Sequence, residues 1–236
     1  MKKTIKKPMF EEVVGVITTI KLDDGLVFNA QRVGPMNFAG LRNADYGPGF
    51  RMPTMPELIP LVYASLENKG KETAKNVIKT LRDSWIGGNT AIHYFPKGMF
   101  AEDVPAMNNE RIITPTYKKL EQRLGSYQEK GVVFSDDKSI RFTPYNYKTK
   151  SQSALELSKN AGVIALTGSE ENAEKIARVS EHYILNPYFW ALSNVYSPQT
   201  RVADLDSGWG DGRLVVGSDY RGNYEYGSSF GVFDGA

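Results

Sequence analysis

Two histidines, His93 and His182, are the side chains best suited to acid–base catalysis or metal binding at neutral pH. Neither has a second ligand or an acidic partner in the local sequence, so we expect structural roles for both. The chain has no cysteine, which excludes disulfides, thiolate nucleophiles, cysteine zinc sites and iron–sulfur clusters. We therefore expect no catalytic residue, no cofactor, no bound transition metal and no hydrolytic turnover.

The stretch from Asp204 to Gly212 contains three aspartates and has the composition of a calcium loop. It lacks the spacing and the terminal bidentate glutamate of an EF-hand, so a turn with solvated aspartates is the prediction. Carboxylates can also work in pairs on glycosidic bonds. A glycan-processing enzyme that uses Asp204, Asp206 or Glu225 therefore stays open as an alternative, supported only by local spacing.

The sequence LTGSEE at residues 166–171 joins a predicted strand to a predicted helix, as phosphate-binding loops do. It has no Gly-Lys-Ser/Thr, and the two glutamates would repel a phosphate. Thr167 and Glu170 fit a capping box, and Ser169 followed by glutamates fits a helix start matched to the helix dipole. We predict a capped helix and no phosphate site.

The segment from residue 187 to 236 differs in composition from the rest of the chain. It has ten aromatic residues, and its three arginines against six acidic residues give a net charge of −3, whereas every lysine lies at or before Lys175. Tyr, Ser, Gly, Asn, Asp and Arg are the residues that antibody-like binding surfaces use. This composition predicts an exposed ligand-binding face. Its candidate residues are Asp206, Ser207, Trp209, Asp211, Arg213, Asp219, Tyr220, Arg221, Asn223, Tyr224 and Tyr226.

Some aromatic residues of this segment have a simpler explanation, because strand residues that pack on a core are also aromatic. We assign that role to Phe189, Trp190, Phe230 and Phe233. In the sequence YEY at residues 224–226, a period of two places both tyrosine rings on one side of an extended chain.

The elements that must position these residues begin with an extended region at residues 10–34, rich in β-branched residues, with a turn signal at Asp24-Gly25. Apolar residues at helical spacing predict two helices, over residues 55–66 and 74–85. A strand is predicted at residues 90–95.

Residues 101–150 are polar and weakly patterned, and residues 101–160 are predicted to form an insertion. Short strands are expected in it at 132–134 and 140–142, and a short helix near 151–159. A buried strand is predicted at 163–166, before a helix that starts near Ser169. The chain is then a tail of residues 1–9 and a single domain of residues 10–236.

Composition limits the environment and the partners of the chain. A net charge of +2 over 236 residues gives no general reason to expect nucleic acid or an anionic membrane as a partner. No apolar run reaches the roughly 20 residues that a membrane helix needs. The basic N-terminus has no apolar region typical of a Sec signal. We therefore expect a virion-associated or cytoplasmic protein without membrane insertion.

Four short motifs together resemble one fold family. The sequence GFRMPTMPEL at 49–58 resembles the W-R-L-P-T-x-x-E-L entry to the first helix of many bacterial C-type-lectin-fold domains. The sequence YFWALS at 188–193 resembles their Y-W-S-S-T strand. It is followed by TRVADL at 200–205 and by SFGVF at 229–233, which resembles their closing strand. The resemblance implies an α+β C-type lectin-like fold, with a two-helix layer, small antiparallel sheets and an inserted middle segment.

Within that fold the C-terminal segment resembles the variable proteins of diversity-generating retroelements, which include phage tropism determinants and archaeal relatives. These systems randomise template adenines, often in AAY codons, which then cannot encode Lys, Glu, Gln, Met or Trp. Residues 206–229 contain none of these five except Trp209 and Glu225. The signatures of calcium-dependent sugar lectins, Glu-Pro-Asn and Trp-Asn-Asp, are absent.

The resemblance implies a non-catalytic receptor-recognition or display protein, whose C-terminal face at residues 187–236 binds a macromolecular ligand. The expected ligand is a protein or a glycan on a cell surface. A structural or adhesive module that is not diversified, such as a tail-fibre tip or a surface domain, is the main alternative. Formylglycine-generating enzymes share the fold but depend on cysteine, so their chemistry does not carry over to this chain.

Overall fold

The computed structural model describes residues 7–208, 212–220 and 222–234. The strands are β1 (Phe10–Val13), β2 (Thr19–Leu22), β3 (Val27–Met36), β4 (Phe50–Arg51), β5 (Trp85–Phe95), β6 (Gly98–Asp103), β7 (Met107–Asn108), β8 (Arg111–Ile112), β9 (Gln128–Glu129), β10 (Val132–Phe134), β11 (Ile140–Thr143), β12 (Lys150–Ser151), β13 (Tyr188–Trp190), β14 (Gln199–Asp206), β15 (Val215–Tyr220) and β16 (Gly227–Phe233). The helices are α1 (Phe38–Asn43), α2 (Met55–Glu67), α3 (Glu72–Asp83), α4 (Tyr117–Glu121), α5 (Ala154–Ser158), α6 (Ala161–Thr167) and α7 (Glu170–Ser180). This mixture confirms the predicted α+β class.

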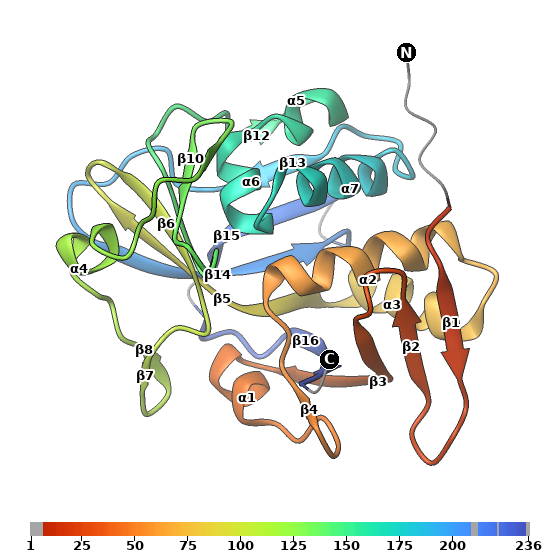
Figure 1. The fold of residues 1–236 in the computed structure, drawn as a ribbon. Coiled ribbons are helices and arrows are strands. Elements are labelled where there is room, and N and C mark those ends of the chain that lie inside the picture. The colour runs from red at the N-terminus through yellow and green to blue at the C-terminus, as the bar shows by residue number, and fades with distance from the viewer. Residues whose placement is uncertain (1–6, 209–211, 221, 235–236) are drawn as a thin grey trace.

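The described strands form one branched network instead of the separate small sheets that were predicted. Its main path runs β1-β2-β3-β16-β5-β14-β15-β13-β12, and the short β7–β8 hairpin stands apart from it. In Figure 1, α2, α3, α6 and α7 cover one side of the long central strands, and α1 lies on the other side. The helix layer is therefore larger than the two helices that were predicted, because α6 and α7 pack against α2.

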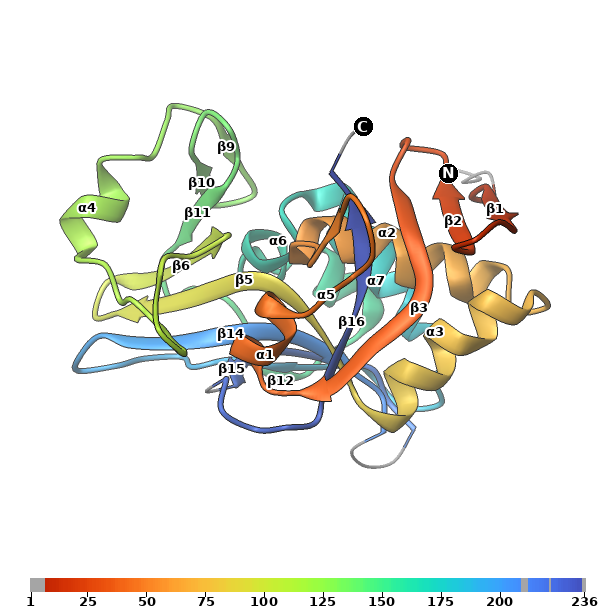
Figure 2. The ribbon, with the colours of Figure 1, turned by 90° about the horizontal axis from the view of Figure 1, so that it is seen from below.

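The two ends of the domain meet in the sheet. Strand β16 lies antiparallel to β3, with Phe230 opposite Arg32 and Val232 opposite Phe28, and Figures 1 and 2 show the two strands side by side. On its other side the start of β16 pairs in parallel with β5. The predicted proximity of the N-terminal strands and the terminal strand is confirmed.

Removal of residues 229–236 is expected to prevent folding. The deletion takes away most of β16, including Phe230 and Val232, which are fully buried in the main core. It also removes the strand that pairs with β3 on the side opposite β2. The truncated chain should show no cooperative thermal transition by circular dichroism. A transition like that of the full chain would show that β16 is dispensable.

Helices α2 and α3 form where the apolar spacing predicted them. Helix α2 begins with a capping box, in which Glu57 accepts hydrogen bonds from the Thr54 N–H (2.7 Å) and hydroxyl (2.9 Å). Arg51 holds the same carboxylate from outside at 2.8 Å, so the pKa of Glu57 stays below its ordinary value even though burial raises it. The motif at residues 49–58 thus fixes the entry into α2.

The strand predicted at residues 163–166 is wrong, because these residues form the buried helix α6. Its side chains are apolar all round, so a short run carries no helical period. Asn160 starts the helix by accepting from the Gly162 and Val163 N–H groups, and Gly168 ends it at a φ of 86°. The next helix, α7, is capped by Ser169, not by the predicted Thr167–Glu170 box. Thr167 instead donates its hydroxyl to the Val163 carbonyl.

The middle of the chain forms a lobe at one end of the molecule, drawn in green at the left of Figures 1 and 2. Strands β10 and β11 lie where they were predicted, and β11 pairs with β6. Residues 101–103 belong to β6, which pairs with β5. The main sheet therefore continues into the segment that was predicted as an insertion.

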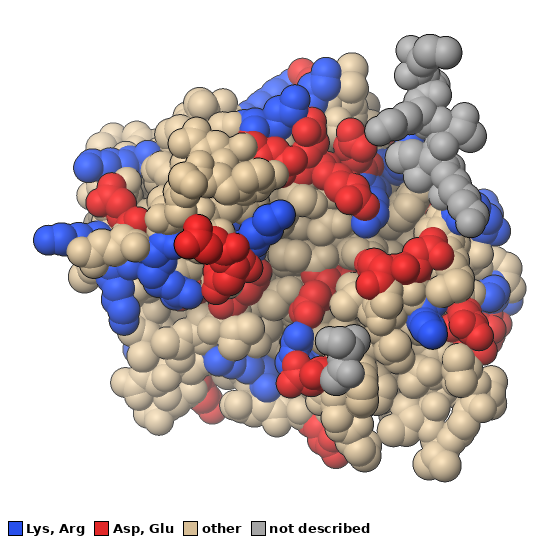
Figure 3. All heavy atoms as spheres, in the orientation of Figure 1, with Lys and Arg blue, Asp and Glu red and all other residues tan. Residues whose placement is uncertain are grey.

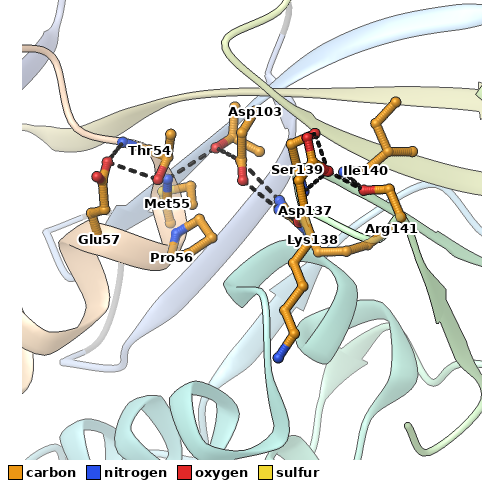
Figure 4. Close-up of polar contacts among 12 residues, drawn as sticks. Thr54, Met55, Pro56, Glu57, Asp103, Asp137, Lys138, Ser139, Ile140 and Arg141 are labelled. Atoms are coloured by element: carbon orange, nitrogen blue, oxygen red, sulfur yellow. Dashed lines mark hydrogen bonds and ion pairs between the residues drawn. The ribbon is translucent and has the colours of Figure 1, made fainter. Parts of the chain in front are cut away.

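A buried polar chain joins this lobe to the helix layer (Figure 4). The fully buried Arg141 holds both oxygens of Asp103, one of them at 2.9 Å, and donates to the Ala165 carbonyl of α6 at 2.6 Å. Asp103 also accepts from the Thr90 hydroxyl at 2.7 Å, and Thr90 accepts from the Met55 N–H of α2 at 2.9 Å. One chain of hydrogen bonds thus connects α2, β5, β6, β11 and α6.

Candidate ligand-binding face

The C-terminal segment supplies central strands of the sheet, because β14 and β15 lie between β5 and β13. Leu205 of β14 and Val216 of β15 are opposite one another and fully buried in the main core beneath the helices. Alternation along β14 therefore places Asp204 and Asp206 on the other side of the sheet, which carries α1. We call this side the outer face.

On the outer face, the Asp204 side chain packs tightly against Gly217 of the neighbouring strand. A Cβ built on Gly217 would lie 2.0 Å from the Asp204 carboxylate, so the aspartate side chain occupies the space above this glycine. Asp204 and Asp206 are both buried. The burial of Asp206 corrects the prediction that this side chain belongs to an exposed surface.

Three aromatic side chains form an exposed cluster where β16 begins. The Trp85 ring meets the rings of Tyr224 and Tyr226 edge-on, with centroids 6.1 and 6.3 Å apart. The tyrosines remain 54% and 64% exposed. Ser84 fixes the backbone beside them, since its hydroxyl donates to the Tyr226 carbonyl at 2.9 Å. Trp85, Tyr224 and Tyr226 are called the aromatic cluster below.

A second aromatic pair lies on β13. Tyr188 and Trp190 pack with ring centroids 5.4 Å apart, and the Arg213 guanidinium lies over the Tyr188 ring at 5.9 Å. Trp190 is 55% exposed, which corrects its prediction as a core residue. Its neighbour Phe189 is fully buried against the other side of the sheet, so the alternation of the strand turns Trp190 outward.

Two adjoining hollows lie beside the loop between β15 and β16. Figure 2 shows this loop, in blue, passing beside α1, and the Phe38 N–H donates to the Gly222 carbonyl at 3.2 Å. One hollow of about 420 Å³ is lined by α1, the β7–β8 hairpin, Thr200 and Asn223. The other, of about 540 Å³, lies between α1, Glu110 and Glu225. The loop therefore presents its tyrosines on one side and Glu225 towards a concave surface.

Comparison of the sequence with protein-family models and with curated proteins finds no match. Among solved structures, the fold matches one that concerns the accommodation of massive sequence variation in Nanoarchaeota by the C-type lectin fold. The TM-score is 0.58 at 16% sequence identity, over 86% of this chain and 96% of the other. The chain has the C-type lectin fold. The fold predicted from the four motifs is confirmed, since the match spans nearly the whole of the solved chain.

The predicted site residues of this C-type lectin fold fall into three groups: exposed or half-buried residues, buried residues, and residues whose side chains are not described. Asn223, Tyr224 and Tyr226 are exposed, and Arg213 is half-buried. Asp206 and Ser207 are buried, with 7% and 8% exposure. The side chains of Trp209, Asp211, Asp219, Tyr220 and Arg221 lie outside the described part of the structure.

Ser207 is buried because it closes the end of α3. Its N–H donates to the Leu81 carbonyl at 2.8 Å and its hydroxyl to the same oxygen at 3.3 Å. The following glycine, Gly208, packs so closely on the Arg82 carbonyl that a Cβ would lie 1.9 Å from it. Ser207 therefore serves the framework of the C-type lectin fold, and the prediction that it is an exposed contact residue is wrong.

Trp85 is the main residue of the binding face that the sequence analysis did not identify. The periodicity of residues 74–85 placed it on the apolar side of a helix, but α3 ends at Asp83 and Trp85 starts β5. Phe233, predicted to lie in the core, is 39% exposed because it closes the last strand edge-on to Phe50.

The histidines have structural contacts. His93 is fully buried and forms hydrogen bonds with Thr200 at 2.9 Å and Glu102 at 3.0 Å. Burial raises the pKa of Glu102, but His93 and Arg123 outweigh it and hold that pKa below its ordinary value. His182 contacts Glu67 at 3.3 Å.

Within the part of the chain that the structure describes, no three His, Asp or Glu side chains gather in a way that would hold a metal ion. The same residues include no helix long and apolar enough to cross a membrane. In Figure 3, Lys and Arg are interspersed with Asp and Glu over the visible face, and the broadest group of basic side chains lies at the left, over α4.

Proposed function

We propose that this protein is a non-catalytic ligand-binding protein that recognises a protein or a glycan on a cell surface through its outer C-terminal face. The aromatic cluster is the observation that carries the proposal. Tyr224 and Tyr226 expose more than half of their surface, yet both are held against Trp85 at the start of a central strand. Rigid, exposed aromatic side chains are typical anchors of recognition surfaces.

The surroundings of the cluster support the same function. Asn223 supplies a polar side chain that adapts to different partners, and the adjoining hollows give a ligand concave surface. The exposed Trp190 and the Arg213–Tyr188 pair offer a second aromatic surface on the neighbouring strands.

We further propose that a retroelement diversifies this face. The described part of the segment divides into a framework and exposed positions. Leu214 and residues 215–218 of β15 are buried, whereas residues 222–226 are exposed or half-buried. Diversification restricted to the exposed positions avoids the core, where random residues would cost several kcal/mol each. The solved C-type lectin fold that accommodates massive sequence variation supports this proposal by analogy.

Sequencing the DNA around the gene tests this part of the proposal. We expect a near-repeat of the 3′ coding sequence beside a reverse transcriptase gene, with mismatches at template adenines. The mismatches should fall in codons such as those of Arg213, Asn223, Tyr224 and Tyr226, and should spare codons 214–218. Absence of the repeat, or mismatches concentrated in codons 214–218, would contradict it.

One observation favours a second candidate. Glu225 cannot arise from a randomised AAY codon, and it lies between the two tyrosines of the cluster. A non-diversified adhesive module with the same ligand-binding face would explain this residue directly. Such a module lacks the template repeat but keeps the binding surface, so the flanking DNA distinguishes the two candidates.

A further inference from the structure

A basic pocket lies on the helix layer, and none of the residues that line it belongs to the aromatic cluster. It has a volume of about 540 Å³ and lies between the end of α2, the exposed side of α3 and the turn after α7. Lys69, Lys75, Lys79 and Arg82 line it. Since α2, α3 and this turn build the pocket, its role does not depend on the proposed function of the C-terminal face.

The basic residues of α3 repeat along one stripe of the helix. Lys75, Lys79 and Arg82 are four and three residues apart, so they lie next to one another on the same face. The opposite face of α3, which includes Val77 and Leu81, is buried in the core. Like charges at this spacing destabilise a helix, so an anion in the pocket would relieve their repulsion.

Nearby carboxylates neutralise some of these charges. Lys75 pairs with Glu72 at 3.0 Å and Arg82 with Asp83 at 3.0 Å. Within the described residues, Lys69 and Lys79 have no ion pair. Lys69, in the turn after α2, and Lys79, on α3, therefore line one hollow without an ion-pair partner among the described residues.

The remaining wall of the pocket is apolar. Leu66 belongs to the main core, and Ile78 and Tyr183 pack against that core while also lining the pocket. His182, which contacts Glu67 at 3.3 Å, completes the rim. A site with cations on its rim and an apolar, partly aromatic wall matches a ligand that has one anionic end and one apolar end.

We propose that this pocket binds an organic phosphate or sulfate monoester, with the oxyanion between Lys69 and Lys79 and the apolar body against Ile78 and Tyr183. The oxyanion is shared by small soluble esters and by phosphate-bearing lipid headgroups. Inorganic phosphate lacks the apolar body and should bind more weakly than an aryl ester. A neutral aryl alcohol lacks the charge and should bind more weakly still.

Calorimetric titration of the full chain with phenyl phosphate, phenyl sulfate, inorganic phosphate and phenol tests the proposal. Both phenyl esters should bind more tightly than phosphate, and phenol should be the weakest. In the Lys69→Gln/Lys79→Gln variant we expect phenyl phosphate to bind about 25-fold more weakly, from about fivefold for each exposed charge contact. A matched variant, Lys118→Gln/Lys119→Gln on α4, should bind as the wild type does.

Sedimentation with phosphatidylcholine vesicles, with and without phosphatidic acid, distinguishes the two sources of the oxyanion. Binding of phosphatidic acid vesicles that is lost in the Lys69→Gln/Lys79→Gln variant assigns the site to a lipid headgroup, and binding of the phenyl esters alone assigns it to a soluble ester. The proposal is overturned if no ester binds, if phenol binds as well as phenyl phosphate, or if the two double variants behave alike. Thermal unfolding of both variants shows that any loss occurs in a folded protein.

Discussion

Replacing Arg141 with methionine is expected to lower the free energy of unfolding by about 3–5 kcal/mol, because the change leaves a buried carboxylate without its partner. Arg141 is fully buried and its guanidinium contacts both oxygens of Asp103. It also donates to the carbonyls of Ala165 and Lys138, at 2.6 and 2.8 Å. Methionine fills a similar volume but satisfies none of these acceptors, so the junction of β6, β11 and α6 loses its polar contacts.

Urea unfolding of the purified variants measures this effect. Arg82→Met is the matched control, because Arg82 pairs with Asp83 at the surface, and such pairs contribute about 1 kcal/mol or less. The double variant Asp103→Leu/Arg141→Met should be more stable than Arg141→Met alone, because it removes the unpaired charge. If Arg141→Met unfolds at the same urea concentration as Arg82→Met, the polar chain does not hold the lobe in place.

Replacing Tyr224 and Tyr226 together with serine is expected to weaken ligand binding by at least about a hundredfold, because exposed aromatic anchors dominate the energy of recognition surfaces. The same change should cost little stability. Both rings are more than half exposed, and each edge-on contact with Trp85 contributes only about 0.5–1.5 kcal/mol. Binding and stability should therefore respond very differently to this variant.

Binding to a glycan array and to intact cells, together with the thermal midpoint, checks this prediction. The control variant is Tyr127→Ser, which removes an exposed tyrosine outside the C-terminal segment. It should bind as the wild type does. A large fall in the thermal midpoint of Tyr224→Ser/Tyr226→Ser with an unchanged ligand preference would show that the cluster is structural.

Local patterns predicted the framework well where one face of an element is buried. The apolar spacing of residues 55–66 and 74–85 matches α2 and α3 because each has one face in the core and one in solvent. The strand predicted at residues 163–166 was wrong, because α6 is buried on all sides and its sequence shows no helical period. The prediction for Trp85 was wrong for another reason. The helical spacing of apolar residues continues past Asp83, where the helix ends.

The binding face was predicted only in part, because the burial of some of its residues depends on contacts with distant parts of the chain. Glycine-rich surroundings correctly indicated exposure for Asn223, Tyr224 and Tyr226. They wrongly indicated exposure for Asp206 and Ser207. Asp206 pairs with Val215 and Ser207 contacts Leu81, and the local sequence does not show such contacts. The carboxylate partner of His93 was equally hidden, since Glu102 reaches it across the β5–β6 hairpin.

The central claim is that the outer C-terminal face binds ligands and tolerates variation while the strands beneath it hold the fold. A display library randomised with NNY codons at Arg213, Asn223, Tyr224 and Tyr226 tests it without knowledge of the natural ligand. We expect most members to resist protease as the wild type does, and selection on lysozyme to yield specific binders. A parallel library at the buried residues Leu205, Val216 and Phe230 should lose protease resistance. Loss of resistance in the first library, or no binder from it after selection, would contradict the claim.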